Sequence, residues 1–233
     1  MFGSAQGIVN RLRRLKLTVP RTISRALAAT LFPPRCCLCG FPGASEDLDL
    51  CQHCHADLPW NRQEMPGVLA PLRFEHPVDE MVRKLKYRGA IENARVLGVL
   101  LAEAARKRDT PLPRLLVPVP LHPARLRERG FNHAFALARY AGRMLEIPAG
   151  RSLTRRVRDT PSQTALDFTA RRQNVRGAFA ICGPKARDRL LGAGHVAIVD
   201  DVMTTGSTAA ELRAVLYAAG VSRVELWAAA RAS

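Results

Sequence analysis

The stretch V-A-I-V-D-D-V-M-T-T-G-S-T, residues 196–208, constrains the fold more than any other part of the sequence. Its first four residues are all apolar, which is typical of a strand buried on both faces of a parallel sheet. Ligands of open α/β sheets bind outside the carboxyl ends of the strands, and Asp200 and Asp201 fall at that end. The stretch therefore predicts a buried parallel strand that leads into a ligand site.

A short polar loop follows the acidic pair. It consists of Thr204, Thr205, Gly206, Ser207 and Thr208. Gly206 allows a turn in which successive N–H groups point at one anion. Thr208 and Glu211 have the T-x-x-E spacing of a capping box, which predicts a helix that begins there. Its positive end would also favour a phosphate.

The carboxylates of Asp200 and Asp201 cannot serve the same phosphate. They suit a sugar diol, or Mg²⁺ bound through water. Carboxylates and loop together predict a ribose 5-phosphate held at both ends. The alternative is a strand–turn–helix with two solvated aspartates and an ordinary cap, and the complete string argues against it.

The rest of the chain alternates between helical and strand patterns. Helices are expected within 78–108, with a break at Gly89, and over 131–145 and 208–220. Strands are expected within 114–121, 195–202 and 223–231, and the connector 61–77 has room for one more. This order predicts an α/β domain with a mainly parallel sheet flanked by helices.

The six cysteines predict a metal site rather than disulfides. Cys36 and Cys39 form one C-x₂-C pair, and Cys51 and Cys54 form another. Two such pairs suit tetrahedral zinc, and four thiolates leave no open position, so the zinc is expected to be structural. The spacer between the pairs is shorter than usual. Cys37 could replace Cys36 as a ligand, and His53 and His55 are possible substitutes that we interpret as flanking surface residues. Cys182 stands alone, and we interpret it as a structural thiol rather than a nucleophile.

The charge of the chain is strongly positive. There are 36 Lys and Arg against 20 Asp and Glu, a net charge of +16. This favours a polyanionic partner, either nucleic acid or a phosphorylated small molecule, although an Arg-rich proteome would have the same effect. We find neither a run that could span a bilayer nor a secretory signal, and we expect a cytoplasmic protein.

Three basic segments are candidate ligand contacts. Arg125, Arg127 and Arg129 are expected in a loop where they could grip a pyrophosphate, or else at the solvated start of a helix. The segment 151–176 could be a lid over a ligand, a nucleic-acid contact or a charged loop. Tyr87 with its basic neighbours in 84–89 suits stacking on a base, but a helix C-terminus has the same composition.

The string 196–208 resembles the phosphoribosyl pyrophosphate (PRPP) binding motif of type I phosphoribosyltransferases. That motif has apolar residues, two acids and then T-T-G-x-T. The resemblance implies a type I phosphoribosyltransferase-like fold over residues 70–233. It also implies that Asp200 and Asp201, the expected catalytic residues, contact the ribose hydroxyls, that 204–208 cradles the 5-phosphate, and that Mg²⁺ accompanies PRPP.

The order of all these motifs resembles the ComF family. The motifs are C-C-L-C-G, C-Q-H-C, K-L-K-Y-R-G, the basic segments and the string 196–208. The resemblance implies an N-terminal double zinc ribbon on a phosphoribosyltransferase domain and a link to DNA uptake in natural transformation. The expected organisation is a basic segment 1–35, a Cys₄ zinc module 36–62 and the domain 70–233.

Two classes of function follow from these expectations. The first is an enzyme that transfers phosphoribosyl from PRPP to an unnamed acceptor. The second is a non-enzymatic competence protein that binds single-stranded DNA or docks on a helicase or recombination protein through the zinc module. The sequence leaves the oligomeric state open, and a dimer is one expectation.

Overall fold

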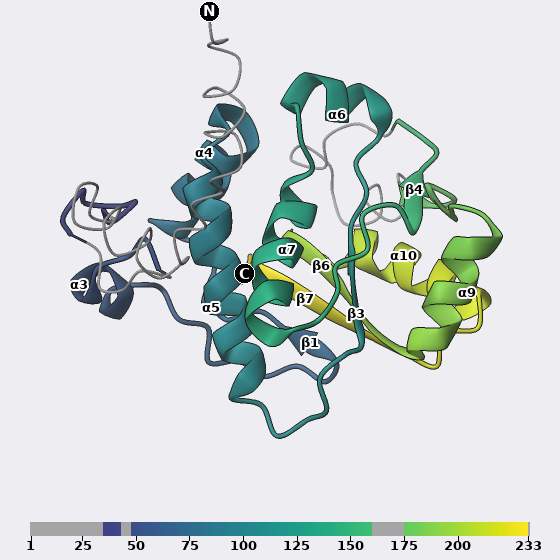
Figure 1. Cartoon of the computed structure of the whole chain (residues 1–233). Coiled ribbons are helices and arrows are strands. Elements are labelled where there is room, and N and C mark those ends of the chain that lie inside the picture. Colours follow the sequence, from purple (N-terminus) through teal and green to yellow (C-terminus); the bar gives the residue numbers. More distant parts are fainter. Residues whose placement is uncertain (1–34, 43–47, 160–174, 233) are drawn as a thin grey trace, which may run out of the picture. The chain divides into compact units, whose positions relative to one another are not determined.

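The computed structural model describes residues 35–42, 48–159 and 175–232. A five-stranded sheet, parallel at every pairing, runs through it (Figure 1). Across the sheet lie β1 (Val68–Leu69), β7 (Arg223–Arg231), β6 (His195–Met203) and β3 (Leu115–Pro118), with β2 (Leu72–Arg73) also paired with β7. The predicted parallel α/β architecture is confirmed. The connector 61–77 contributes two short strands where one was expected.

Helices connect and cover these strands. They are α3 (Gln52–Ala56), α4 (Val78–Arg88), α5 (Ile91–Arg106), α6 (Pro123–Arg129), α7 (His133–Leu145), α9 (Pro184–Ala193) and α10 (Ser207–Ala218). The break at Gly89 is confirmed, because Gly89 ends α4 with a φ of 65°, a conformation that glycine adopts without strain. Two strands outside the main sheet, β4 (Thr154–Arg156) and β5 (Phe179–Ile181), pair antiparallel. In the described ranges, no helix has both the length and the apolar character needed to cross a membrane.

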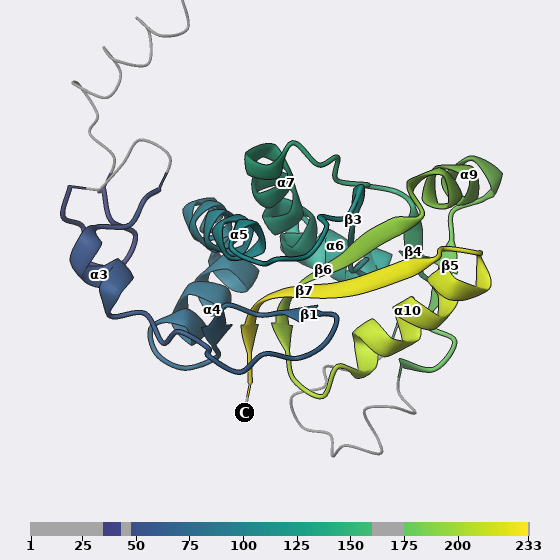
Figure 2. The ribbon, with the colours of Figure 1, turned by 90° about the horizontal axis from the view of Figure 1, so that it is seen from below.

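The central strand β6 is buried on both faces. Ala197 and Val199 belong to one apolar cluster, which α4, α5 and α7 also enter. Val196 and Ile198 belong to a second cluster, which is shared with α9 and α10. Figure 2 shows α5 and α7 on one side of the sheet and α10 on the other. Because alternate residues of a strand face opposite sides, the continuous apolar run of β6 serves both layers.

The cysteine-containing region packs against the first of these layers. Cys36, Leu50 and Cys51 are buried in the same cluster as the helices α4 and α5. Arg95 of α5 also forms an ion pair with Asp49, which lies between the two C-x₂-C pairs. The apolar core thus continues from the cysteine region into the helix layer.

The close approach of α5 and α7 generates a stability prediction. A Cβ added to Gly98 would lie 2.8 Å from the backbone oxygen of Leu137 and 2.8 Å from Cβ of Tyr140, both in α7. Gly98→Ala should therefore lower the free energy of unfolding by about 1–3 kcal/mol, the usual cost of overpacking. The matched control is Gly192→Ala in α9, where nothing lies within 4 Å and alanine should be neutral or slightly stabilising. Urea unfolding measures both, and equal effects would contradict this account of the packing.

Candidate functional site

Asp200 and Asp201 lie near the carboxyl end of β6, where the sequence placed them. The carboxylate Oδ1 of Asp200 accepts a hydrogen bond from the N–H of Asp201 at 2.9 Å, and Oδ1 of Asp201 accepts one from the N–H of Val202 at 2.8 Å. Asp201 is buried, with 4% of its surface exposed, whereas Asp200 is partly exposed. One carboxylate therefore faces the protein interior and the other remains accessible.

The buried carboxylate has two basic neighbours from two helices. Nζ of Lys86, in the last turn of α4, lies 2.7 Å from Oδ2 of Asp201. Nε2 of His133, the first residue of α7, lies 3.4 Å from the same oxygen. Sequence analysis treated Lys86 as a basic neighbour of Tyr87, either in a base-stacking segment or at a helix C-terminus, and did not single out His133. The position of neither residue in the sequence predicts a contact with β6.

Burial and mutual repulsion separate the pKa values of the two aspartates. Desolvation, reinforced by the charge of Asp201, raises the pKa of Asp200 to about 8. Desolvation acts in the same direction on Asp201, but the positive charges of His133, when it is protonated, and of Lys86 outweigh it and lower that pKa to about 2. Lys86 is the stronger of those groups at neutral pH, because burial lowers the pKa of His133 to about 4 and leaves its ring neutral. Asp201 is thus the charged member of the pair.

The loop after β6 has the predicted turn but not the predicted cap. Gly206 adopts a φ of 71° and is the N-cap of α10, which begins at Ser207 without a side-chain capping bond. The capping box of Thr208 and Glu211 is therefore wrong. Glu211 instead accepts a hydrogen bond from the N–H of Gly177 at 2.7 Å. Gly206 takes this left-handed conformation without strain, and the helix begins one residue before Thr208.

A small hollow lies beside this loop. Oγ1 of Thr205 and Oγ of Ser207 lie 2.7 Å apart. The hollow has a volume of about 50 Å³. Its polar and backbone lining comes mainly from Asp200, Thr204, Gly206, Ser207 and Thr208. Its position at the amino end of α10 suits an anion, because the helix dipole is positive there.

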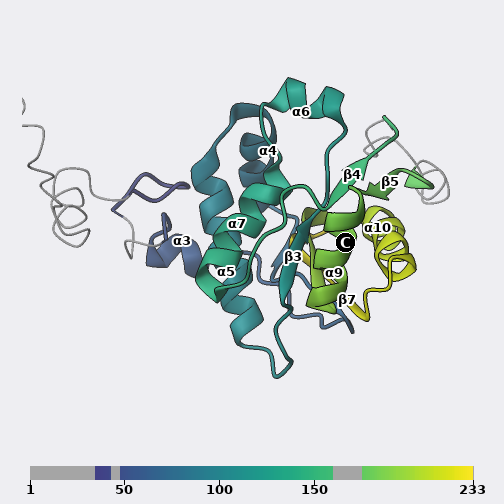
Figure 3. The ribbon, with the colours of Figure 1, turned by 45° about the vertical axis from the view of Figure 1, so that its right-hand side comes forward.

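The three arginines predicted to bind pyrophosphate lie on the short helix α6 rather than in a loop. Arg125 and Arg129 are four residues apart and share a face, while Arg127 is exposed. Nε of Arg125 lies 3.9 Å from Oδ1 of Asp159, and the guanidinium of Arg129 lies 5.3 Å from the ring centre of Tyr87. Figure 3 shows α6 beside the end of α4 that carries Lys86.

Arg156 of β4 extends this basic surface toward the acidic pair. Burial and the charge of Arg125 lower the pKa of Arg156, whereas Asp200 and Asp159 act in the opposite direction. Asp200 is thus close enough to Arg156 for their charges to interact. Sequence analysis did not single out Arg156 from the basic segment 151–176. Residues 160–174 of that segment, and 1–34 of the expected basic N-terminal segment, lie outside the described residues.

The four predicted zinc ligands converge. The Sγ atoms of Cys36, Cys39, Cys51 and Cys54 all lie within 4.8 Å of one another. Sγ of Cys39 and Sγ of Cys51 are 3.6 Å apart, close to the ~3.8 Å between sulfurs that tetrahedral Zn–S bonds of ~2.3 Å require. Cys37 is outside this group of converging sulfur atoms. All six cysteines lie in the described part of the chain, and none of them forms a disulfide.

These features define an α/β protein with a candidate anion site at the carboxyl edge of its sheet and a four-cysteine cluster that could bind zinc. No family model matches the chain. It is 32% identical to Competence protein F of Haemophilus influenzae over 207 residues, with 85% of each chain covered. It is also 32% identical to DNA utilization protein YhgH of Escherichia coli K12 and 31% identical to that of Salmonella typhi, in both cases over 84% of this chain and 83% of the relative. The chain belongs to the ComF family.

The ion pair of Lys86 with the buried Asp201 yields a test with a control on the same helix. Lys86→Met should lower the free energy of unfolding by about 3–5 kcal/mol, because it leaves a buried carboxylate without its counter-charge. Lys84 pairs with Glu80 at 3.2 Å on the exposed face of α4. Lys84→Met should therefore change stability little. Similar losses for both variants, measured by urea unfolding, would show that Lys86 does not neutralise Asp201.

Asp200 predicts a pH dependence of stability. The folded chain keeps a proton on Asp200 up to about pH 8, whereas an unfolded aspartate loses it near pH ~4. The contribution of Asp200 to the free energy of unfolding of the wild type therefore falls as the pH rises from about 4 to 8. Asp200→Asn has no proton to lose, so we expect it to melt above the wild type at pH ~8 and the difference to shrink toward pH ~5. Melting in a buffer without added Mg²⁺ measures this, and a difference independent of pH would contradict the raised pKa.

Proposed function

We propose that this protein binds PRPP at the carboxyl edge of its sheet. The observation that carries the proposal is that two features lie together: the partly exposed side chain of Asp200, and a hollow that Asp200 lines with Thr204, Gly206, Ser207 and Thr208. A carboxylate accepts hydrogen bonds from a ribose diol, while N–H groups and hydroxyls at a helix start receive the 5-phosphate. In this proposal Asp201 holds Lys86 and keeps the edge ordered.

The pyrophosphate end of PRPP would lie toward α6. Arg125 and Arg129 share the face of α6 that approaches Asp159 and Tyr87, whereas Arg127 is exposed and contributes mainly long-range charge. Mg²⁺ would accompany PRPP and neutralise the negative charge of the pyrophosphate. Ionisation of Asp200, which burial disfavours, becomes easier when a bound cation supplies compensating charge.

Phosphoribosyl transfer would proceed by loss of pyrophosphate from C1 of the ribose. The bond between C1 and the pyrophosphate oxygen breaks, the electron pair leaves with the pyrophosphate, and an acceptor attacks C1 from the opposite side. Arg125 and Arg129 would stabilise the charge of the leaving group, which is the main contribution that fixed positive groups make to such a step. Asp200 would hold the ribose hydroxyls in place.

The biological role we propose is DNA uptake or utilisation in the cytoplasm. The names of the relatives, Competence protein F and DNA utilization protein, support it. The net charge of +16 is compatible with single-stranded DNA as a partner, and a helicase or recombination protein could dock on the cysteine module. Deleting the gene should lower uptake or use of DNA, and unchanged transformation and growth on DNA would contradict this role.

Calorimetric titration of PRPP with Mg²⁺ tests the binding proposal. The wild type should bind, and Asp200→Ala/Asp201→Ala should lose detectable binding. Arg125→Gln should weaken affinity by about tenfold, the loss of one charge-assisted contact, while Arg127→Gln should change it little. Absence of binding to folded, metal-loaded wild type would refute the proposal. Pyrophosphate release with candidate acceptors then separates an enzyme from a PRPP-binding protein.

We further propose that zinc on Cys36, Cys39, Cys51 and Cys54 is structural. With all four ligands from the protein, it would have no position open for catalysis. Purified protein should contain about one zinc per chain by metal analysis. Cys51→Ser/Cys54→Ser should lose the metal and melt at a lower temperature, whereas Cys182→Ser, an exposed thiol outside the cluster, should keep both. Full zinc content in the double variant would exclude this ligand set.

A further inference from the structure

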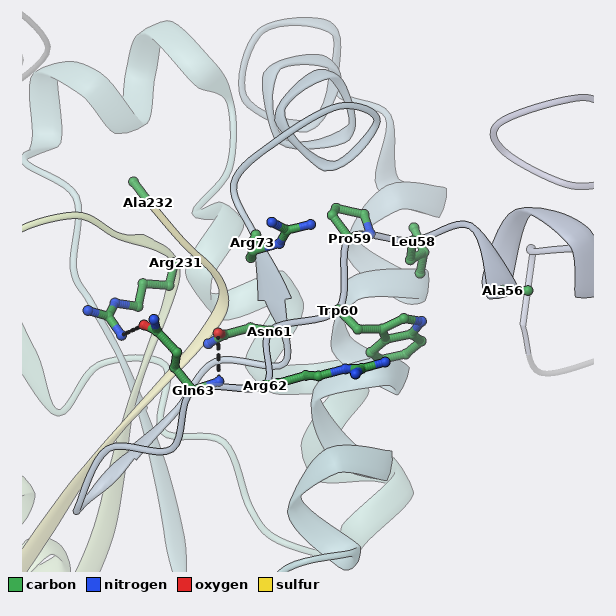
Figure 4. A pocket seen from close by; sticks show the side chains of 10 residues that line it. All are labelled: Ala56, Leu58, Pro59, Trp60, Asn61, Arg62, Gln63, Arg73, Arg231 and Ala232. Carbon is green, nitrogen blue, oxygen red and sulfur yellow. Dashed lines mark hydrogen bonds between the residues drawn. The ribbon is translucent and has the colours of Figure 1, made fainter.

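A second basic cavity lies beside the proposed PRPP site and has no role in it. It has a volume of about 760 Å³ and lies between the end of the cysteine region and the ends of β2 and β7 (Figure 4). Its lining includes one aromatic ring, three arginines and two amides. These are Trp60, Arg62, Arg73, Arg231, Asn61 and Gln63.

The lining is cationic without internal compensation. Its described residues include three arginines and no aspartate or glutamate. Arg231 donates a hydrogen bond to Oε1 of Gln63 at 3.0 Å. Nη1 of Arg73 lies 3.3 Å from Oε1 of Glu75, and a half-exposed ion pair of this kind adds little to stability. Arg62 has no hydrogen-bond or ion-pair partner within the described ranges. The cavity therefore attracts an anion.

Trp60 can contact a ligand in this cavity through its aromatic ring but not by donating a hydrogen bond. Its only donor, Nε1, already donates to the backbone oxygen of His55 at 3.2 Å. The His55 and Trp60 rings lie 5.0 Å apart at an angle of 59°, which holds the indole in position. Figure 4 shows the side chain of Arg62 extended toward Trp60. A fixed indole next to a guanidinium suits a flat ring that carries negative charge nearby.

The cavity opens at the same edge of the sheet as the acidic pair. Arg231 of β7 is in register with Met203 of β6, and the N–H of Ala232 donates to the backbone oxygen of Met203 at 2.9 Å. Met203 immediately precedes Thr204, the first residue of the loop 204–208. The β7 end of the cavity is thus one strand spacing, ~5 Å, from the end of β6, where the loop begins.

We propose that this cavity binds a nucleotide unit, with the base stacked on Trp60 beside Arg62 and the phosphate held by Arg231 on the opposite side of the cavity. The ligand is either a free nucleotide or one unit of a single-stranded nucleic acid, which share this chemistry. Arg groups bind phosphate oxygens in a bidentate manner, and stacking on an aromatic side chain tolerates any base. The site does not depend on PRPP binding, because it shares no lining residue with the hollow beside the loop 204–208.

Intrinsic fluorescence can observe this site directly. The chain has two tryptophans, and Trp227 is completely buried, so quenching by an added base reports on Trp60. The probes are oligothymidylate, thymidine 5′-monophosphate and inorganic phosphate. The variants are Arg62→Gln/Arg231→Gln and Trp60→Phe. The control is Arg189→Gln, an exposed arginine on α9, and circular dichroism verifies that every variant is folded.

Quenching of the wild type by oligothymidylate or by the monophosphate supports the proposal, and the stronger of the two identifies the source of the ligand. Arg62→Gln/Arg231→Gln should weaken that binding by at least about tenfold, while Arg189→Gln should not. Trp60→Phe should show no quenching. No quenching of the wild type, or equal binding by the double variant and the control, would overturn it. PRPP titrated into the double variant should bind as in the wild type, which separates this site from the proposed function.

Discussion

The ion pair between Lys86 and Asp201 is the interaction on which the site depends. Two adjacent carboxylates at the end of a buried strand repel each other, and burial makes both costly to ionise. Lys86, 2.7 Å from Asp201, compensates one charge. It thereby ties the end of α4 to β6, and the contact of Tyr87 with Arg129 ties α6 to the same place. The basic residues around the site are therefore positioned by the same interaction that makes the acidic pair tolerable.

The sequence was sufficient for the strand and loop that carry this site. All four residues of the run Val196–Val199 are apolar, which is compatible with burial on both faces of the sheet. Gly206 marks the turn that follows. The cluster of Cys36, Cys39, Cys51 and Cys54 was also predictable, because paired cysteines at short spacing have few other uses in a chain of this kind. In each case a local pattern specifies the chemistry.

The features that sequence analysis missed are tertiary. His133 and Lys86 reach Asp201 only because α4 and α7 pack on one face of the sheet. The failed capping box has the same origin, because Glu211 finds a partner in Gly177, which is distant in sequence. Glu225 is a further example. It is buried on β7 and accepts hydrogen bonds from Arg108, Arg223 and Trp227. The spacing of these residues in the sequence does not predict the network.

A crystal structure of the protein with PRPP and Mg²⁺ tests the central claim most directly. The account predicts the 5-phosphate in the hollow formed by residues 204–208 and the ribose hydroxyls within hydrogen-bond distance of Asp200. It also predicts the pyrophosphate toward Arg125 and Arg129. A phosphoribosyl ligand bound elsewhere, with the hollow filled only by water, would contradict the account.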